Sequence, residues 1–242
     1  MENSQFYLGV ETSGRCGSIA ISDTQQQMVQ IDLQQQGRKH AQTLVSEVKN
    51  LLNQLKLAPN QITGIGVSRG PGSFTGLRIG TAFAKTFGYV TGCPVLGVDT
   101  FEAIALNCPP EISETYVISN AQRGDLFVGK YLKISDNQWE RTSEICLWEI
   151  TDFCHSLKPG DTINGPGIEL LDTPSLFDYR LLEPEFRNPV AAKISVITAR
   201  ILQNSPSADH AALSEVWDLT PFYLRKSAAE EKWDATRQIH TD

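Results

Sequence analysis

The stretch that most constrains the fold of this chain is the glycine-rich segment 67–81, which reads VSRGPGSFTGLRIGT. It follows a short apolar run at 62–67 and leads into apolar positions of helical spacing at 77–89. A strand, a glycine-rich turn and a helix in this order are typical of α/β proteins, and the start of such a helix presents backbone N–H groups to an anion. The segment therefore predicts an α/β fold with a candidate anion site.

The turn within this segment, residues 70–75, contains residue types that hold one backbone shape. Gly70 and Gly72 adopt positive φ without steric cost, and the proline between them stiffens the bend. Ser73 and Thr75 are residue types that cap the start of a helix. All four are therefore candidate nucleotide-binding residues. In the alternative interpretation, the turn only lets the helix pack tightly on the sheet.

The spacing of the glycines argues against two common nucleotide-binding loops. A P-loop needs two glycines separated by four residues and followed by Lys and then Ser or Thr. The glycines of segment 67–81 do not have this spacing, and no Lys follows them there. Gly70, Gly72 and Gly76 form a pattern one residue longer than the dinucleotide-binding fingerprint. Asp99 ends the next predicted strand, where a ribose-binding acid would lie. An NAD-binding oxidoreductase therefore stays open as an alternative.

The composition narrows the class of protein. The chain has 242 residues, a net charge of −7 and no run of Lys or Arg, whereas a protein that grips nucleic acid directly usually shows a basic face. Its five cysteines include no Cys-x-x-Cys pair, so neither a disulfide framework nor a zinc site is expected. The sequence lacks a signal-peptide pattern and an apolar stretch of membrane-spanning length, so we expect a cytoplasmic protein with no membrane partner.

The best candidate boundary in the chain is Pro109-Pro110, which divides it into 1–108 and 109–242. Each half opens with strand, turn and strand and later contains helices, which favours a duplicated α/β fold. Predicted strands lie at 6–10, 17–22, 28–33, 62–67, 95–98, 115–119, 126–134, 144–147 and 162–164. Predicted helices lie at 40–56, 74–89, 100–106, 149–157 and 190–202.

Residues 68–80, which read SRGPGSFTGLRIG, resemble the signature of the TsaB family, bacterial accessory subunits for the synthesis of threonylcarbamoyladenosine in tRNA. Four other stretches agree in order: Gly9-Val-Glu-Thr-Ser13, His40-x-x-x-Leu44, Arg123-Gly-Asp-Leu-Phe127 and Pro221-x-Tyr-Leu-Arg225. The resemblance spans most of the chain. It implies kinship with the glycoprotease-like TsaD proteins and their two-lobed, duplicated actin/sugar-kinase-like (ASKHA, ribonuclease H-like) fold.

The resemblance also points to the loss of a catalytic site. Where catalytic relatives end the first strand with an acid that places metal and phosphate, usually Asp, this chain has Glu11, which we add to the vestigial nucleotide-binding residues. TsaD-type subunits build a metal site on His-x-x-x-His, but here His40 is followed at i+4 by Leu44. Asn120 stands where the family segment usually begins with Asp. We therefore expect no catalytic residue, cofactor or metal in this chain, and ATP or ADP and metal in its partners.

The resemblance implies that two helices of the N-terminal lobe, 1–108, pack against the matching pair of a TsaD-like catalytic subunit. The predicted partner-contacting residues are His40, Leu44, Val48, Leu51, Leu55, Phe74, Leu77 and Arg78. The C-terminal lobe with its tail is 109–242. We expect a homodimer when the partner is absent, because related lobes offer isologous faces.

The predicted function is that of a non-catalytic subunit. With TsaD and a TsaE-like ATPase, the chain would support threonylcarbamoyladenosine formation at the adenosine next to the anticodon, and it would reach tRNA only through the complex. The first alternative is a nucleotide-binding transferase or kinase of the same fold that acts on its own. The second is the NAD-binding oxidoreductase.

Overall fold

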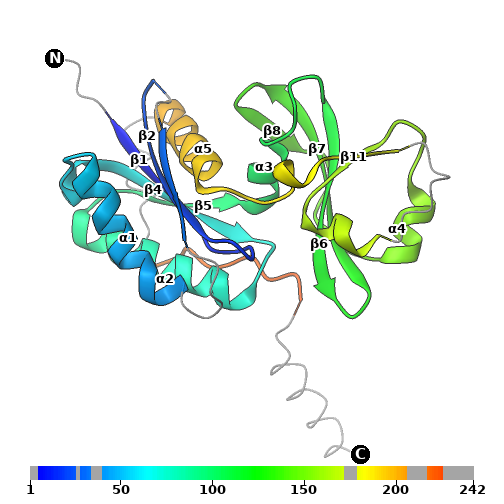
Figure 1. The fold of residues 1–242 in the computed structure, drawn as a ribbon, viewed down its shortest axis with the longest axis horizontal. Helices are drawn as coiled ribbons and strands as arrows, with labels where there is room; N and C mark the ends of the chain where they lie inside the picture. The colour runs from blue at the N-terminus through cyan, green and yellow to red at the C-terminus, as the bar shows by residue number, and fades with distance from the viewer. Residues whose placement is uncertain (1–4, 26–27, 34–39, 172–178, 206–216, 226–242) are drawn as a thin grey trace, which may run out of the picture.

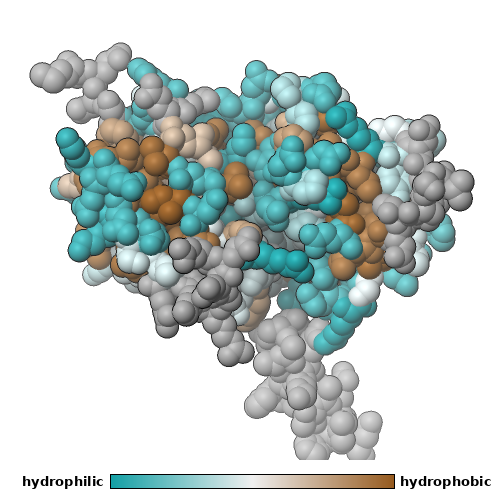
Figure 2. Space-filling view, viewed as in Figure 1, coloured by the Kyte–Doolittle hydropathy of each residue, from teal (hydrophilic) through white to brown (hydrophobic). Residues whose placement is uncertain are grey.

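The computed structural model describes residues 5–25, 28–33, 40–171, 179–205 and 217–225; the side chains of 40–42 lie outside the described part. The described residues form two lobes, each built on one mixed β-sheet (Figure 1). The face drawn in Figure 2 is largely hydrophilic, with apolar patches on both lobes. Within the described ranges, no helix combines the length and the apolar character that crossing a membrane requires.

The first sheet has the strand order β3-β2-β1-β4-β5. Its strands are β1 (Phe6–Glu11), β2 (Ser18–Asp23), β3 (Met28–Asp32), β4 (Ile62–Gly70) and β5 (Val95–Asp99). The helices that follow its strands are α1 (His40–Gln54), α2 (Phe74–Thr91) and α3 (Thr100–Ala105), and a short 3-10 helix, η2 (Pro59–Gln61), precedes β4.

The second sheet has the order β11-β10-β6-β7-β8, with β9 paired to β7. Its strands are β6 (Glu114–Gln122), β7 (Asp125–Ser135), β8 (Gln138–Arg141), β9 (Cys146–Glu149), β10 (Thr162–Asn164) and β11 (Arg180–Leu181). The remaining helices are α4 (Ile150–Ser156), η3 (Pro166–Leu170), η4 (Pro184–Phe186) and α5 (Ala191–Asn204).

The two sheets repeat one topology. In the first, β1, β2 and β3 are antiparallel neighbours, β4 is parallel to β1, and β5 is parallel to β4. In the second, β6, β7 and β8 are antiparallel neighbours, β10 is parallel to β6, and β11 is parallel to β10. The predicted duplicated, two-lobed α/β fold of the actin/sugar-kinase type is therefore confirmed.

Helices cover both faces of the first sheet. Apolar side chains of α1 pack with those of β1, β2 and β4 in one core cluster. On the opposite face α5 lies directly on the strands, because a Cβ atom on Gly9 would lie 2.2 Å from the Ala191 carbonyl oxygen. A second core cluster joins the lobes, since it contains Phe101 of α3, Ile194 of α5 and Phe127 of β7. Helices α3 and α5 therefore form the connection between the lobes (Figure 1).

Most predicted elements are present, but three features differ from the prediction. The prediction lacks strand β8, because its four residues are mostly polar. It also lacks β11, because two residues are too few to show a period. The proposed boundary at residue 108 falls between α3 and β6. Helix α5 nevertheless packs on the first sheet, so we propose that the first lobe consists of 1–108 together with α5.

Candidate functional site

Four of the five stretches that support the family resemblance, all but the one at 40–44, meet near the carboxyl ends of β4 and β5, at residues 217–225. We call these nine residues the strap; they are drawn in orange-red in Figure 1. Ser73 N–H donates to Ser13 O at 2.8 Å, which joins the glycine turn to the β1–β2 turn. Phe222 N–H of the strap donates to Arg69 O at 2.7 Å. Ligands of open α/β sheets bind outside the carboxyl ends of the strands, so this junction is the candidate site.

Two backbone N–H groups of the glycine turn, those of Gly70 and Ser73, have partners within the chain. Gly70 N–H donates to Thr100 Oγ1 at 3.0 Å. Ser73 N–H is held by Ser13 O, and Ser73 Oγ caps α2 by accepting from Gly76 N–H at 3.3 Å. Pro71 has no N–H to offer. The N–H groups of Gly70 and Ser73 therefore do not point into an open anion site, while the half-buried Phe74 and the exposed Thr75 follow them at the start of α2.

The glycines of this segment let the β1–β2 turn lie against the start of α2. A Cβ atom on Gly76 would lie 1.8 Å from Thr12 O, and one on Gly72 would lie 2.7 Å from Ser13 Cβ. Thr12 Oγ1 donates to Gly76 O at 2.8 Å, which fastens the two segments together. The geometry therefore supports the alternative interpretation of the turn, tight packing of a helix on a sheet.

Glu11 lies at the end of β1 and is completely buried. Its Oε1 accepts hydrogen bonds from the Ser13 hydroxyl at 2.5 Å, from the Ser13 N–H and from the Gly14 N–H at 3.2 Å. Its Oε2 has no hydrogen-bond partner among the described residues. Burial raises the pKa of the Glu11 carboxyl, and the bonds from Ser13 and Gly14 offset part of this shift. The carboxyl group is thus folded onto its own turn.

Glu11 is not free to place a metal-bound nucleotide. Its carboxylate is held by its own turn, and the N–H groups of Gly70 and Ser73 are bonded within the chain. In the part of the chain that the structure describes, no three His, Cys, Asp or Glu side chains gather closely enough to hold a metal ion.

Asp99, the acid of the NAD hypothesis, connects the two lobes. Its Oδ1 accepts from Phe101 N–H at 2.9 Å and caps α3, while its Oδ2 accepts from the Tyr131 hydroxyl at 2.6 Å. Arg141 lies 3.7 Å from the same Oδ2. Burial raises the pKa of Asp99, and the bond from Tyr131 opposes that shift. Because both carboxylate oxygens are engaged, the geometry gives no support to ribose binding.

Four of the predicted partner-contacting residues are part of the core, and for them the prediction is corrected. Leu44, Val48, Leu51 and Leu77 are at most 3 % exposed. The helical period turns these side chains toward the sheet, where the first three pack with strand residues. Their place in the core follows from the same spacing that predicted the helices.

The other predicted contacts differ in exposure. Leu55 and Phe74 are half-buried and Arg78 is exposed, so for these three residues contact with a partner stays a prediction. The side chain of His40 lies outside the described residues.

The exposed apolar side chains lie on the other faces of the same helices. Among the large hydrophobic residues that the structure describes, the highest exposed fractions belong to Val90 (75 %), Tyr89 (71 %), Trp217 (69 %) and Val45 (63 %). Val45 is on α1, the first two are on α2, and the Trp217 ring lies 5.8 Å from that of Tyr89. We call Tyr89, Val90 and Trp217 the apolar face. The prediction missed them because it followed the apolar row that packs into the core.

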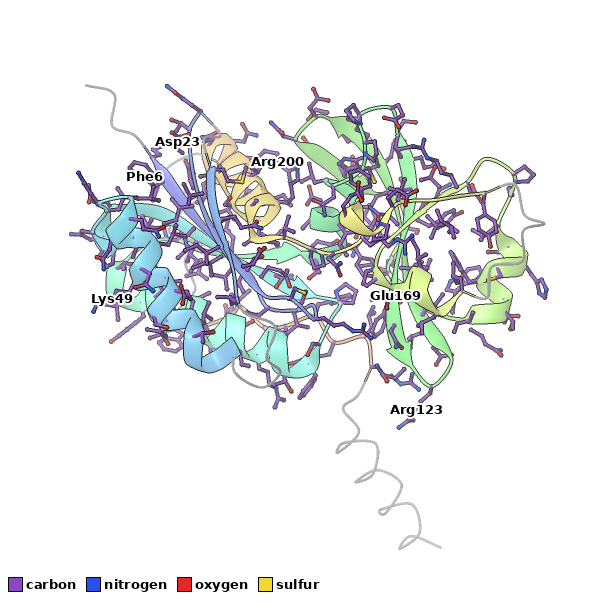
Figure 3. All side chains as sticks on the ribbon, viewed as in Figure 1. Phe6, Asp23, Lys49, Arg123, Glu169 and Arg200 are labelled. Carbon is purple, nitrogen blue, oxygen red and sulfur yellow. The ribbon has the colours of Figure 1, made fainter. Side chains whose placement is uncertain are left out.

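The strap also joins two motifs that lie a hundred residues apart in the sequence. Arg225 Nη1 donates to Asp125 Oδ2 at 3.1 Å and to the backbone oxygens of Ala121 and Gln122 at 2.8 and 3.1 Å. In the sequence, this contact was signalled by the resemblance of both stretches, 123–127 and 221–225, to the TsaB family. Arg123, in the turn between β6 and β7, points away from the body of the molecule (Figure 3).

Comparison with known proteins agrees with this geometry. Residues 27–164 match the family model described as "TsaD: tRNA N6-adenosine threonylcarbamoyltransferase". The tRNA threonylcarbamoyladenosine biosynthesis protein TsaB of Bacillus subtilis is 28 % identical over 206 residues, which cover 81 % of this chain and 84 % of that protein. The protein of the same name from Escherichia coli is 28 % identical over 117 residues, covering 47 % of this chain and 51 % of that protein.

A solved structure shows the same fold. The structure named YeaZ from Pseudomonas aeruginosa superimposes with a TM-score of 0.72 at 18 % identity, covering 91 % of this chain and 100 % of that chain. The family model, the curated relatives and the fold all agree with the motifs that meet at the strap. The chain therefore belongs to the TsaB family and carries the domain that the TsaD family model describes.

Proposed function

We propose that this chain is a non-catalytic subunit of the machinery that forms threonylcarbamoyladenosine in tRNA. In that reaction a threonylcarbamoyl group passes from its adenylate to the adenosine next to the anticodon. The observation that carries the non-catalytic assignment is that the Glu11 carboxylate is buried and bonded to its own turn. The N–H groups of Gly70 and Ser73 in the glycine turn are bonded within the chain as well. The names of the relatives from B. subtilis and E. coli support the pathway.

The catalytic partner that we propose is a TsaD-like subunit, joined by a TsaE-like ATPase. The docking surface would be the outward side of α1 and α2, with the apolar face at its centre. Helix α2 has 18 residues but only two charged ones, Arg78 and Lys85. Aromatic residues and Arg are typical of interface centres, where other charged residues are depleted. An apolar surface of this kind also supports self-association when the partner is absent.

Gel filtration of this chain mixed with its cognate TsaD tests the proposal. We expect a stable heterodimer at micromolar concentrations, and its absence would contradict the proposal. Complementation of a TsaB-depleted bacterium, scored by the modified nucleoside in its tRNA, tests the pathway independently of the interface.

Calorimetry with Mg-ATP tests the alternative of an enzyme that acts alone. We expect no heat of binding at millimolar nucleotide. Saturable binding that Glu11→Gln abolishes would favour an autonomous transferase or kinase instead.

A further inference from the structure

The strap contacts the first lobe through its backbone. Lys85 Nζ donates to Trp217 O at 3.0 Å, where the strap begins. Arg69 Nε donates to Thr220 O at 3.2 Å, and Arg69 O accepts from Phe222 N–H at 2.7 Å. The strap is therefore bonded to both the side chain and the backbone carbonyl of Arg69, near the carboxyl end of β4.

Side chains of the strap are seated on the same lobe. The ring of Tyr223 lies 4.7 Å from that of Phe74, and its hydroxyl accepts from Arg78 Nε at 3.2 Å. The Arg78 guanidinium lies 3.9 Å from the centre of the Phe74 ring. Leu219 packs against Gly97 of β5, where a Cβ atom would lie 2.6 Å from Leu219 Cδ1. These contacts place the strap across the ends of both strands.

The last residue of the strap holds the second lobe. The Arg225 guanidinium binds two carbonyl oxygens and one carboxylate oxygen of the β6–β7 turn. That turn has positive φ at Gln122 (68°) and Arg123 (58°), a conformation that L-residues adopt at a cost. The contacts of Arg225 offset part of this cost, so the strap and the turn hold one another in place.

Two-lobed proteins commonly close around a ligand by a hinge motion. Here the strap lies where such a ligand would lie and reaches both lobes. Away from the strap, the Tyr131 hydroxyl bonds to Asp99, and Arg200 Nη1 of α5 donates to Asn137 O at 2.8 Å. We propose that the strap is a built-in clamp that takes the place of a bound ligand and fixes the angle between the lobes. The clamp thereby keeps this chain in one arrangement without nucleotide.

A distance measurement between the lobes tests the clamp. Spin labels are attached to Lys49→Cys on α1, which Figure 3 labels on the first lobe, and to the exposed native Cys146 on β9. The other four cysteines are replaced by alanine in the full chain. We expect one narrow distance distribution that Mg-ATP and inorganic phosphate leave unchanged. A distribution that is already broad in this reference chain would overturn the proposal.

Removing the clamp is the second arm of the experiment. In Arg225→Ala we expect the distribution to broaden and shift to longer distances, because the second lobe loses the three hydrogen bonds that Arg225 donates to it. Tyr223→Ala, which leaves Arg225 in place, should produce the same shift to a smaller extent and serves if Arg225→Ala does not fold. The matched control is Arg180→Ala, which removes a 3.0 Å ion pair with Glu111 inside the second lobe. If folded strap variants give the distribution of the control, the clamp does not exist.

Discussion

Strands β4 and β10, which occupy equivalent positions in the two lobes, both lead into a Gly-Pro-Gly turn, but the chain continues differently after each turn. Strand β4 runs into Gly70-Pro71-Gly72 and β10 is followed by Gly165-Pro166-Gly167. The first turn lies against the β1–β2 turn, where a Cβ atom on Gly72 would lie 2.7 Å from Ser13 Cβ, and the second lies against β6, where a Cβ atom on Gly165 would lie 2.2 Å from Ile118 O. The first turn leads into α2, of 18 residues, whereas η3, of five residues, already begins at Pro166 within the second turn. Because a turn of the same sequence occurs in both lobes, we propose that the function of the first lobe depends on the helix α2 that follows it and not on the turn itself.

The largest effect is expected from filling the close approaches in either lobe. Gly76→Ala would place a methyl group 1.8 Å from Thr12 O, and Gly165→Ala would place one 2.2 Å from Ile118 O. We expect each to lower the free energy of unfolding by about 3 kcal/mol, because backbone must move to make room. Urea unfolding measures this loss.

Gly124→Ala is the control for these substitutions. Gly124 has a φ of 85° but no atom within 4 Å of an added Cβ. We expect it to lower stability by only about 1 kcal/mol. A loss at Gly165 (φ 106°) no larger than the loss at Gly124 would mean that positive φ, and not close packing, explains the glycine of the second turn.

The next effect separates the exposed side of the first-lobe helices from their buried side. Tyr89→Glu combined with Val90→Glu should weaken binding to a TsaD-like partner by about 2 kcal/mol, roughly thirtyfold, because a charge replaces a dehydrated anchor. Leu51→Glu should instead unfold the chain, since Leu51 is a core residue. Surface plasmon resonance with immobilised partner and circular dichroism distinguish the two results.

Ile134→Glu supplies the matched control on the second lobe. Ile134 is 50 % exposed on β7, so the charge is tolerated there. Its partner affinity should equal that of the unaltered chain. A loss as large as that of the Tyr89 and Val90 variant would place the interface elsewhere.

The smallest effect concerns the pH dependence of stability. The pKa of Glu11 is raised above its ordinary value by burial, so the folded state holds its proton more tightly than the unfolded state does. The contribution of Glu11 to stability is therefore fully present below the unfolded pKa and is lost as pH rises through the folded pKa. Glu11→Gln should make the unfolding free energy less dependent on pH across this window, as chemical denaturation in a pH series would record. An unchanged pH profile would show that Glu11 is not the group responsible.

How much of this structure can be predicted from the sequence depends on how far apart in the sequence the contacting residues lie. The strands and helices of the first lobe came from local periodicity, and the glycine turn was located from residue type alone. The roles of Leu44 and Val45 could not be separated, because both lie on one amphipathic helix and only the sheet decides which side is covered. Arg225 of the strap donates a hydrogen bond to Asp125, and no local sequence pattern predicts a contact between residues that lie 100 positions apart.

Glu11 shows the same limit within the candidate site. The family resemblance marked position 11 as one that places metal and phosphate in catalytic relatives, and the extra methylene of Glu relative to Asp was the visible departure. That its Oε1 turns back to accept from Ser13 and Gly14 is a property of the folded β1–β2 turn. The chemistry of a residue type was thus visible in the sequence, but its orientation was not.

The most direct test of the central claim is threonylcarbamoyl transfer to tRNA in a mixture of this chain, its cognate TsaD and TsaE. The account predicts that Glu11→Gln supports the same rate as the unaltered chain, while the variant with Glu at positions 89 and 90 supports little transfer because it fails to dock. If Glu11→Gln folds and binds TsaD normally but abolishes transfer, the candidate site acts in the reaction and the non-catalytic assignment is contradicted.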